Sequence, residues 1–164
     1  MTLEHLILMR HAKSSWQHDG LTDHQRPLNK RGRRAAHAIG ALLKARELTP
    51  DHIWSSDSQR TRETVAHAFP GIDIVPVWQN GFYHASANQV LYVCGEHGEP
   101  KGQTLLLMGH NPGWEDLLFH FSDLSRRMPT GACAIFKRAN TETDWLENES
   151  WKLEDLLYPR DFES

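Results

Sequence analysis

The sequence lacks the features that mark several large classes of protein. Its 164 residues include two cysteines, Cys94 and Cys133, which are too few for a disulfide framework and do not have the spacing of a zinc site. No apolar run approaches the ~20 residues of a membrane-spanning helix. The N-terminus has neither the basic region nor the long apolar region of a signal peptide. These absences predict a protein of the reducing cytoplasm.

Neither sign of charge dominates the chain. It has 18 basic and 21 acidic residues and a formal net charge of −3, which predicts no general affinity for nucleic acid or for anionic membrane. Hydrophobic residues make up 39% and charged residues 24%, proportions typical of a globular protein. The length fits a single domain with a sizeable core, so we expect residues 1–164 to fold together.

Nucleotide-binding and metal-ligand motifs are also missing. The chain contains neither a Walker A pattern nor a dinucleotide-binding glycine pattern. Eleven histidines scatter at no fixed spacing, and the His-Asp pairs at 18–19 and 23–24 match no metal signature. We therefore predict no metal ion and no cofactor.

What the sequence does contain is an alternation of short apolar runs and segments with helical periodicity. Segment 104–108 is short and almost wholly apolar, which is typical of a strand buried on both faces. Segment 30–47 follows the N-cap candidate Asn29 and repeats its apolar residues at helical spacing. This alternation predicts a three-layer α/β/α sandwich with a largely parallel central sheet. The expected strands are 3–9, 52–55, 72–77, 104–108, 132–137 and 151–153, and the last two are expected to pair antiparallel. Two helices are expected at 30–47 and 87–94. A third follows the cap candidates Ser56 and Asp57 and ends at Phe69, and a fourth has Asn111 as its N-cap and Pro112 in its first position.

Polar side chains stand at the ends of three of these strands. If the three strands are parallel, their carboxyl ends share one rim, where open α/β sheets bind ligands. Arginines and helix N-termini favour phosphate there, and a neutral imidazole can attack phosphorus. The rim is therefore predicted to be a pocket for a phosphoryl dianion. The residues are Arg10 and His11 after the first strand, Ser55 and Ser56 with Arg60 after the second, and Gly109 and His110 after the fourth.

A long polar segment, 12–28, follows His11 directly. It contains Gly20 and Pro27 and little periodicity, which predicts a loop. Loops of this length in compact domains are usually functional or disordered, and because this one starts at His11 we predict a flap over the pocket. Its polar residues include Lys13, Ser14, Ser15, Asp19, Asp23 and Arg26.

Three motifs in this order resemble those of the histidine phosphatase superfamily, across residues 3–137. They are Leu8-Met9-Arg10-His11-Ala12, the segment 56–64 (SDSQRTRET) and Gly109-His110-Asn111-Pro112. The short chain, the Arg26-Pro27-Leu28 segment and the third motif are similar to the SixA-like phosphohistidine phosphatases.

The resemblance implies a phosphoglycerate mutase-like fold with His11 as the phosphorylated nucleophile. It also implies that Arg10, Arg60 and His110 hold the phosphoryl oxygens. Around them we predict a set of substrate-binding residues, again without a metal ion. This set is Lys13, Ser14, His84 and Asn111.

Two departures from the superfamily pattern stand out. The usual Arg-His-Gly is Arg-His-Ala here, a mild change. More important, no carboxylate occurs between Asp73 and Glu96, where many members carry a general acid. The remaining candidates for a proton donor are His84, Tyr83, and the flap carboxylates Asp19 and Asp23.

The missing acid bears on the substrate. An alkoxide leaving group needs a proton in the transition state, whereas phosphohistidine protonated on its other ring nitrogen departs as neutral imidazole, whose conjugate acid has a pKa of ~6.5. We therefore predict a metal-independent phosphatase of phosphohistidine or another activated phosphoryl donor. The alternatives are a phosphatase of small phosphomonoesters and a phosphate-binding regulatory protein with little turnover. We predict that the partner of this protein is a phosphorylated protein or a small phosphorylated molecule. The sequence is compatible with a monomer.

Overall fold

A six-stranded mixed sheet forms the centre of the molecule in the computed structural model, which describes residues 2–162. The strand order is β3-β2-β4-β1-β5-β6. Strands β3, β2, β4 and β1 are parallel to one another, and β5 pairs antiparallel with both β1 and β6. The strands are β1 His5–Arg10, β2 His52–Ser56, β3 Val77–Gln79, β4 Thr104–Gly109, β5 Cys133–Arg138 and β6 Trp151–Leu157; the α-helices are α1 Lys30–Ala45, α2 Gln59–Ala68, α3 Ala87–His97 and α4 Gly113–Ser122.

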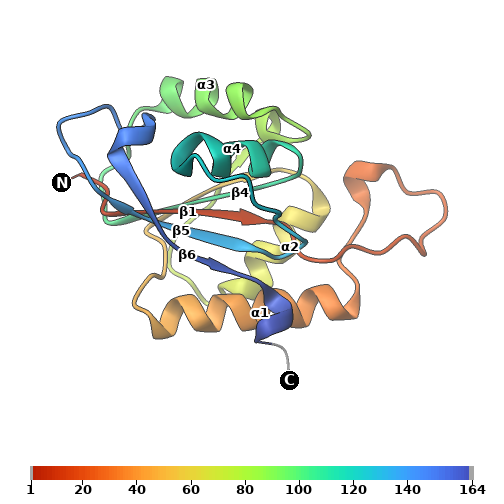
Figure 1. Ribbon diagram of the computed structural model, residues 1–164. Coiled ribbons are helices and arrows are strands. Elements are labelled where there is room, and N and C mark those ends of the chain that lie inside the picture. Colours follow the sequence, from red (N-terminus) through yellow and green to blue (C-terminus); the bar gives the residue numbers. More distant parts are fainter. Residues whose placement is uncertain (1, 163–164) are drawn as a thin grey trace.

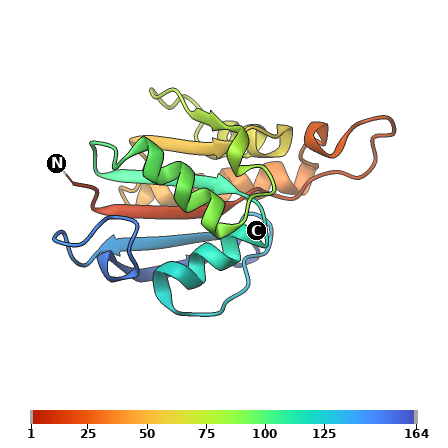
Figure 2. The same ribbon diagram turned by 90° about the horizontal axis from the view of Figure 1, so that it is seen from above.

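Helices cover both faces of this sheet. Figure 1 shows α3 and α4 over one face and α1 beneath the other, and Figure 2 shows α3 and α4 from above. Strand β1 contributes to both cores, since Leu6 and Leu8 pack on the α3 and α4 side while Ile7 and Met9 pack on the side of α1 and α2. The predicted three-layer α/β/α sandwich with a largely parallel sheet is confirmed, and it is phosphoglycerate mutase-like.

The register of the three central strands brings their carboxyl ends to one rim. Strand β1 pairs with β4 so that Arg10 lies opposite Gly109, and β4 pairs with β2 so that Met108 lies opposite Ser55. Both β1 and β4 are buried along their length, which is why their sequences are continuous apolar runs. The residues that follow the three strands must therefore lie close together.

Helix α1 and the antiparallel pairing of the two final strands are confirmed, but β6 continues past the predicted 153 to Leu157, because it pairs with β5 as far as Cys133, and two other boundaries were wrong. Strand β3 begins at Val77 instead of 72, because Pro76 has no N–H to donate to a ladder. The N-cap of α2 is Ser58, whose side chain accepts from the Thr61 N–H, whereas Ser56 remains in β2 and Asp57 lies between strand and cap.

The predicted cap of α4 was also wrong. The helix begins at Gly113, with Pro112 as its N-cap and no capping side chain. Asn111 is occupied elsewhere: its Nδ2 donates to the Met128 carbonyl at 2.8 Å and to the Glu115 carboxylate at 3.0 Å. None of the helices in residues 2–162 is long and apolar enough to cross a membrane.

Candidate active site

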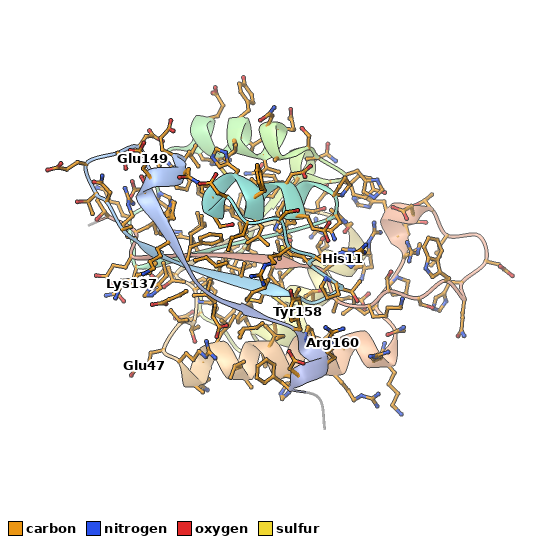
Figure 3. The ribbon with its side chains drawn as sticks, in the orientation of Figure 1. His11, Glu47, Lys137, Glu149, Tyr158 and Arg160 are labelled. Atoms are coloured by element: carbon orange, nitrogen blue, oxygen red, sulfur yellow. The ribbon has the colours of Figure 1, made fainter. Side chains whose placement is uncertain are left out.

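The carboxyl ends of β1, β2 and β4 bring two histidines and an arginine into contact. The ring centroids of His11 and His110 are 5.2 Å apart, and Arg60 Nη2 lies 3.5 Å from His110 Nδ1. Figure 3 shows His11 at the end of the sheet from which the 12–28 loop projects. The convergence predicted from three strand ends is therefore present in the structure.

His11 is held as a neutral imidazole with one nitrogen free. Its Nδ1 lies 2.7 Å from the Ala12 carbonyl, an acceptor, so Nδ1 carries the proton and Nε2 carries the lone pair. Burial, together with the charges of Arg60 and Arg10, outweighs the hydrogen bond to Ala12 and lowers the pKa of His11 to about 3. At neutral pH Nε2 is thus an unprotonated nitrogen beside two guanidinium groups.

His110 is oriented by a serine that lies 54 residues earlier in the chain. Its Nε2 lies 2.8 Å from Ser56 Oγ, while Nδ1 faces the Arg60 guanidinium. Because a guanidinium can only donate, Nδ1 is the acceptor and Nε2–H donates to Ser56. Burial lowers the pKa of His110 to about 2, with contributions from His11 and Arg60. Ser56 was predicted at the rim from its place at the end of the second strand, but its role as the partner of His110 was not predicted.

Two glycines allow this close arrangement. A Cβ on Gly109 would lie 2.2 Å from the Trp114 indole, which fills the space beside the end of β4. A Cβ on Gly113 would lie 2.2 Å from the Ala85 carbonyl, so α4 begins directly against the loop that carries Tyr83 and His84. Side chains at these positions would push the His110 turn away from its neighbours.

The two arginines differ in their surroundings. Arg60 is only 3% exposed, and both of its terminal nitrogens donate to Asp23, Nη1 to the backbone carbonyl at 2.7 Å and Nη2 to Oδ2 at 3.0 Å. Arg10 donates from Nη1 to the Met128 carbonyl at 3.1 Å. Each guanidinium is therefore fixed by a loop that belongs to another part of the chain.

The 12–28 loop lies against the site, as the predicted flap requires. Its two arms pair through a bridge between Ser14 and Leu28. Arg26 connects them further, since its Nη2 donates to Ser14 Oγ and its guanidinium stacks 3.2 Å from the centroid of the Trp16 ring. The Asp23 contact with Arg60 ties the loop to α2.

Asp23 is a poor proton donor in this position. Its carboxylate accepts from Tyr83 at 2.6 Å, from Arg26 at 2.9 Å and from Arg60 at 3.0 Å. Burial alone would raise its pKa, but the hydrogen bonds from Tyr83, Arg26 and Arg60 outweigh burial and hold the pKa of Asp23 far below its usual value. An ionised carboxylate cannot protonate a leaving group, so Asp23 instead positions Arg60 and the flap.

The other candidates for a proton donor are placed differently. Burial and the hydrogen bond to Asp23 raise the pKa of Tyr83, so its hydroxyl keeps the proton. His84 stands at the mouth of the site with 55% of its side chain exposed, and its Nε2 lies 3.1 Å from Arg60 Nη2 and 3.2 Å from Asp23 Oδ2. Asp19 is exposed near the tip of the loop and does not line the site cavity.

The site cavity has a volume of about 250 Å³ and is lined by every predicted site residue. Within the flap, Lys13 is exposed at the edge of the cavity and Ser14 is buried. Asn111 also lines the cavity, and its side-chain Nδ2 holds the loop at Met128 in place. Substrate binding by Lys13, Ser14, His84 and Asn111 stays a prediction.

Comparison with known proteins decides the family. Residues 6–81 match the family model described as the histidine phosphatase superfamily, branch 1. A chloroplastic protein of Arabidopsis thaliana, itself uncharacterised, is 31% identical over 94% of this chain and 77% of its own length. The chain belongs to the histidine phosphatase superfamily.

Solved structures place this histidine phosphatase near one group within the superfamily. A protein from Agrobacterium tumefaciens assigned as phosphohistidine phosphatase SixA is 28% identical, with a TM-score of 0.79 over 95% of this chain and 98% of that one. A second, from Nakamurella multipartitia with the same assignment, is 26% identical, with a TM-score of 0.78 over 95% and 96% of the two chains. The chain is SixA-like, and it is a phosphatase of the histidine-phosphatase type.

In this histidine phosphatase, we expect Arg60→Ala to lower kcat by roughly 10²- to 10³-fold, the usual contribution of one electrostatic contact to a transition state. The measurement is steady-state hydrolysis of phosphoramidate. Arg62→Ala is the matched control, because Arg62 lies on the same helix but is exposed and does not line the site. Equal losses in the two variants, or full activity in a folded Arg60→Ala protein, would contradict a role in phosphoryl transfer.

Proposed function

We propose that the protein hydrolyses phosphohistidine or another activated phosphoryl donor, without a metal ion, through a phosphorylated intermediate on His11. The observation that carries the proposal is the neutral His11 imidazole, held by the Ala12 carbonyl with Nε2 unprotonated in a cavity that Arg10 and Arg60 also line. Such a nitrogen is a competent nucleophile toward phosphorus. The two guanidiniums lie where they can stabilise negative charge on the transferring group.

The reaction takes two steps. The phosphoryl oxygens bind the guanidinium groups of Arg10 and Arg60, with His110 beside them, and His11 Nε2 forms a bond to phosphorus as the bond to the leaving group breaks. A water molecule then attacks the phosphorus of the phosphoimidazole, and the bond between phosphorus and His11 Nε2 breaks. The proton that the water loses passes to solvent or to the released phosphate. Nearly all of the catalysis is positioning and charge stabilisation.

The choice of substrate rests on the absence of a strong proton donor. Asp23 is held ionised, and the Tyr83 hydroxyl keeps its proton in a hydrogen bond to Asp23, which leaves the exposed His84 as the remaining candidate among the predicted proton donors that contact Arg60 or Asp23. A neutral imidazole departs without such help. The assignment of SixA-like relatives as phosphohistidine phosphatases supports the same class.

The charge of the pocket supports the proposal that the protein needs no metal ion. Arg10 and Arg60 flank the two histidines, and fixed positive charges oppose the binding of a divalent cation. Within residues 2–162, no group of three or more histidine, cysteine, aspartate or glutamate side chains is placed to hold a metal ion. A cytoplasmic location, a phosphorylated protein as partner and a monomeric state stay predictions.

A substrate panel tests this proposal. We expect turnover of a phosphohistidine protein and of phosphoramidate, both unchanged after exhaustive treatment with EDTA, and little turnover of sugar phosphates. Loss of activity with EDTA that a divalent ion restores would show a metal-dependent enzyme. Faster hydrolysis of sugar phosphates would support the phosphomonoesterase alternative, and phosphate binding with no turnover of any donor would support the regulatory protein.

A further inference from the structure

A second cavity opens beside the site cavity. Its volume is about 590 Å³, more than twice that of the site, and the two share Arg10, Lys13, Asn111 and Thr130 in their linings. We call it the basic groove. Its charged and aromatic lining residues are Arg10, Lys13, Glu115, Arg127, Tyr158 and Arg160.

The charge of the basic groove is opposite to that of the whole chain. Four of its lining residues are cationic and one is acidic, whereas the chain has a formal net charge of −3. The single carboxylate, Glu115, is already occupied, since its Oε2 accepts from the Met128 N–H at 2.8 Å and from Asn111 at 3.0 Å. The positive charge is therefore local and faces solvent.

The outer cations of the groove have no acidic partner in the described part of the chain. Arg127 and Lys13 are exposed and form no ion pair there. Arg160 is also exposed and lies over Tyr158, with 5.4 Å between its guanidinium carbon and the ring centroid. The cations at this place are therefore available to an external anion.

The walls of the groove are fixed in position. Tyr158 donates from its hydroxyl to the Arg127 carbonyl at 3.2 Å, which joins the end of β6 to the loop after α4. The same loop is joined to the site by the bond from Arg10 Nη1 to the Met128 carbonyl. Figure 3 shows Tyr158 and Arg160 on the same side of the molecule as His11. A ligand that extends from His11 into the basic groove would therefore meet walls that are held in position and that carry exposed cations.

We propose that the basic groove binds an acidic segment of a protein substrate, next to the phosphorylated residue that enters the site. The inference rests on the proposed function and adds the chemistry of the residues that flank the phosphoryl group. A small phosphoryl donor fits within the 250 Å³ site and makes no use of the groove. A phosphorylated protein must place neighbouring side chains over Lys13, Arg127 and Arg160, where carboxylates complement the charge.

Binding of two labelled peptides tests the groove. Both carry the same stable phosphoryl-triazole analogue of phosphohistidine, flanked in one by glutamates and in the other by glutamines, and their dissociation constants are measured by fluorescence anisotropy at low salt. Each exposed ion pair changes affinity about 1.4- to 5-fold. We therefore expect the wild type to bind the acidic peptide about tenfold more tightly, with the preference declining as salt rises.

The variant Arg127→Glu/Arg160→Glu should lose this preference and leave kcat and KM for phosphoramidate unchanged. The control Lys137→Glu/Lys152→Glu makes the same change of charge. Lys137 and Lys152 are exposed and pair across β5 and β6, and Lys137 lies opposite His5 at the start of β1, the end of the sheet away from His11 (Figure 3). The control should keep the preference for the acidic peptide.

Several results would overturn the proposal. The first is equal affinity of the wild type for the two peptides, and the second is an equal loss of the preference for the acidic peptide in the control variant. The third is a raised KM for phosphoramidate in the groove variant, which would show that these cations bind the phosphoryl group itself. Failure of the proposed function would look different, because the wild type would then turn over no phosphoryl donor while still preferring the acidic peptide. Hydrolysis of phosphoramidate without any preference would remove the groove and keep the activity.

Discussion

Replacement of His11 by alanine should reduce turnover of phosphoramidate by roughly 10⁴-fold or more, the scale of loss when a covalent nucleophile is removed. The reason is geometric as well as chemical. His110 is the imidazole that contacts the His11 ring, but its Nε2–H donates to Ser56 and its Nδ1 accepts from Arg60. Neither nitrogen of His110 is therefore free to replace His11 Nε2 as the group that attacks phosphorus.

The intermediate can be detected directly. Quenching the wild type during turnover of a labelled phosphoryl donor should leave acid-labile, base-stable label on the peptide that contains His11, and none in His11→Ala.

Because burial lowers the pKa of His11 to about 3, its imidazole is neutral above that pH, and its ring NMR signals should not move between pH 8 and pH 5.

His37→Ala is the control for this experiment, since His37 is exposed on α1 and remote from the site cavity. It should keep full activity and full labelling. Label on a serine such as Ser14, or activity retained in a folded His11→Ala protein, would show that the nucleophile has been misidentified.

The second large effect concerns the leaving group. With no strong acid in the site, the rate of phosphoryl transfer should depend steeply on the basicity of the departing group. General acid catalysis contributes ~10²- to 10⁴-fold, so activated aryl phosphates should react at least about 100-fold faster than alkyl phosphates of similar size. The measurement is kcat/KM for a series of aryl and alkyl phosphates of graded leaving-group pKa.

Two variants identify the acid if this expectation is wrong. A shallow dependence in the wild type that becomes steep in His84→Ala would assign proton donation to His84, which stands 3.1 Å from Arg60 at the mouth of the site. A shallow dependence that becomes steep in Asp23→Asn would assign it to Asp23.

As the residue that positions Arg60, Asp23 should behave in another way. Asp23→Asn should weaken turnover of all substrates in the same proportion and leave the slope of the series unchanged, because the amide removes charge from the Arg60 contact without removing a proton donor. The matched control is Asp19→Asn, on the same loop but outside the site cavity, which should leave both rate and slope unchanged.

The sequence by itself determined the elements on which the site is built. Strands β1 and β4 were predicted because a strand buried on both faces needs a continuous apolar run, and α1 because Asn29 and a helical repeat are adjacent in the chain. Asn29 indeed caps α1 by accepting from the Gly32 N–H. Caps and periodicity act over a few residues, so they can be interpreted without knowing the fold. Each of the three motifs also spans only a few residues, so their order in the chain predicted the family without knowledge of the fold.

Only the tertiary structure decided how the candidate residues act. Asp23 meets Arg60 and Tyr83 from 37 and 60 residues away, and those contacts turn a candidate acid into an ionised group that holds an arginine. The choice of Ser56 as the partner of His110, and the low pKa of His11, depend in the same way on which segments the sheet order brings together. Burial and Coulomb interactions are set by distances in space, and distances between segments remote in sequence are fixed only when the chain has folded.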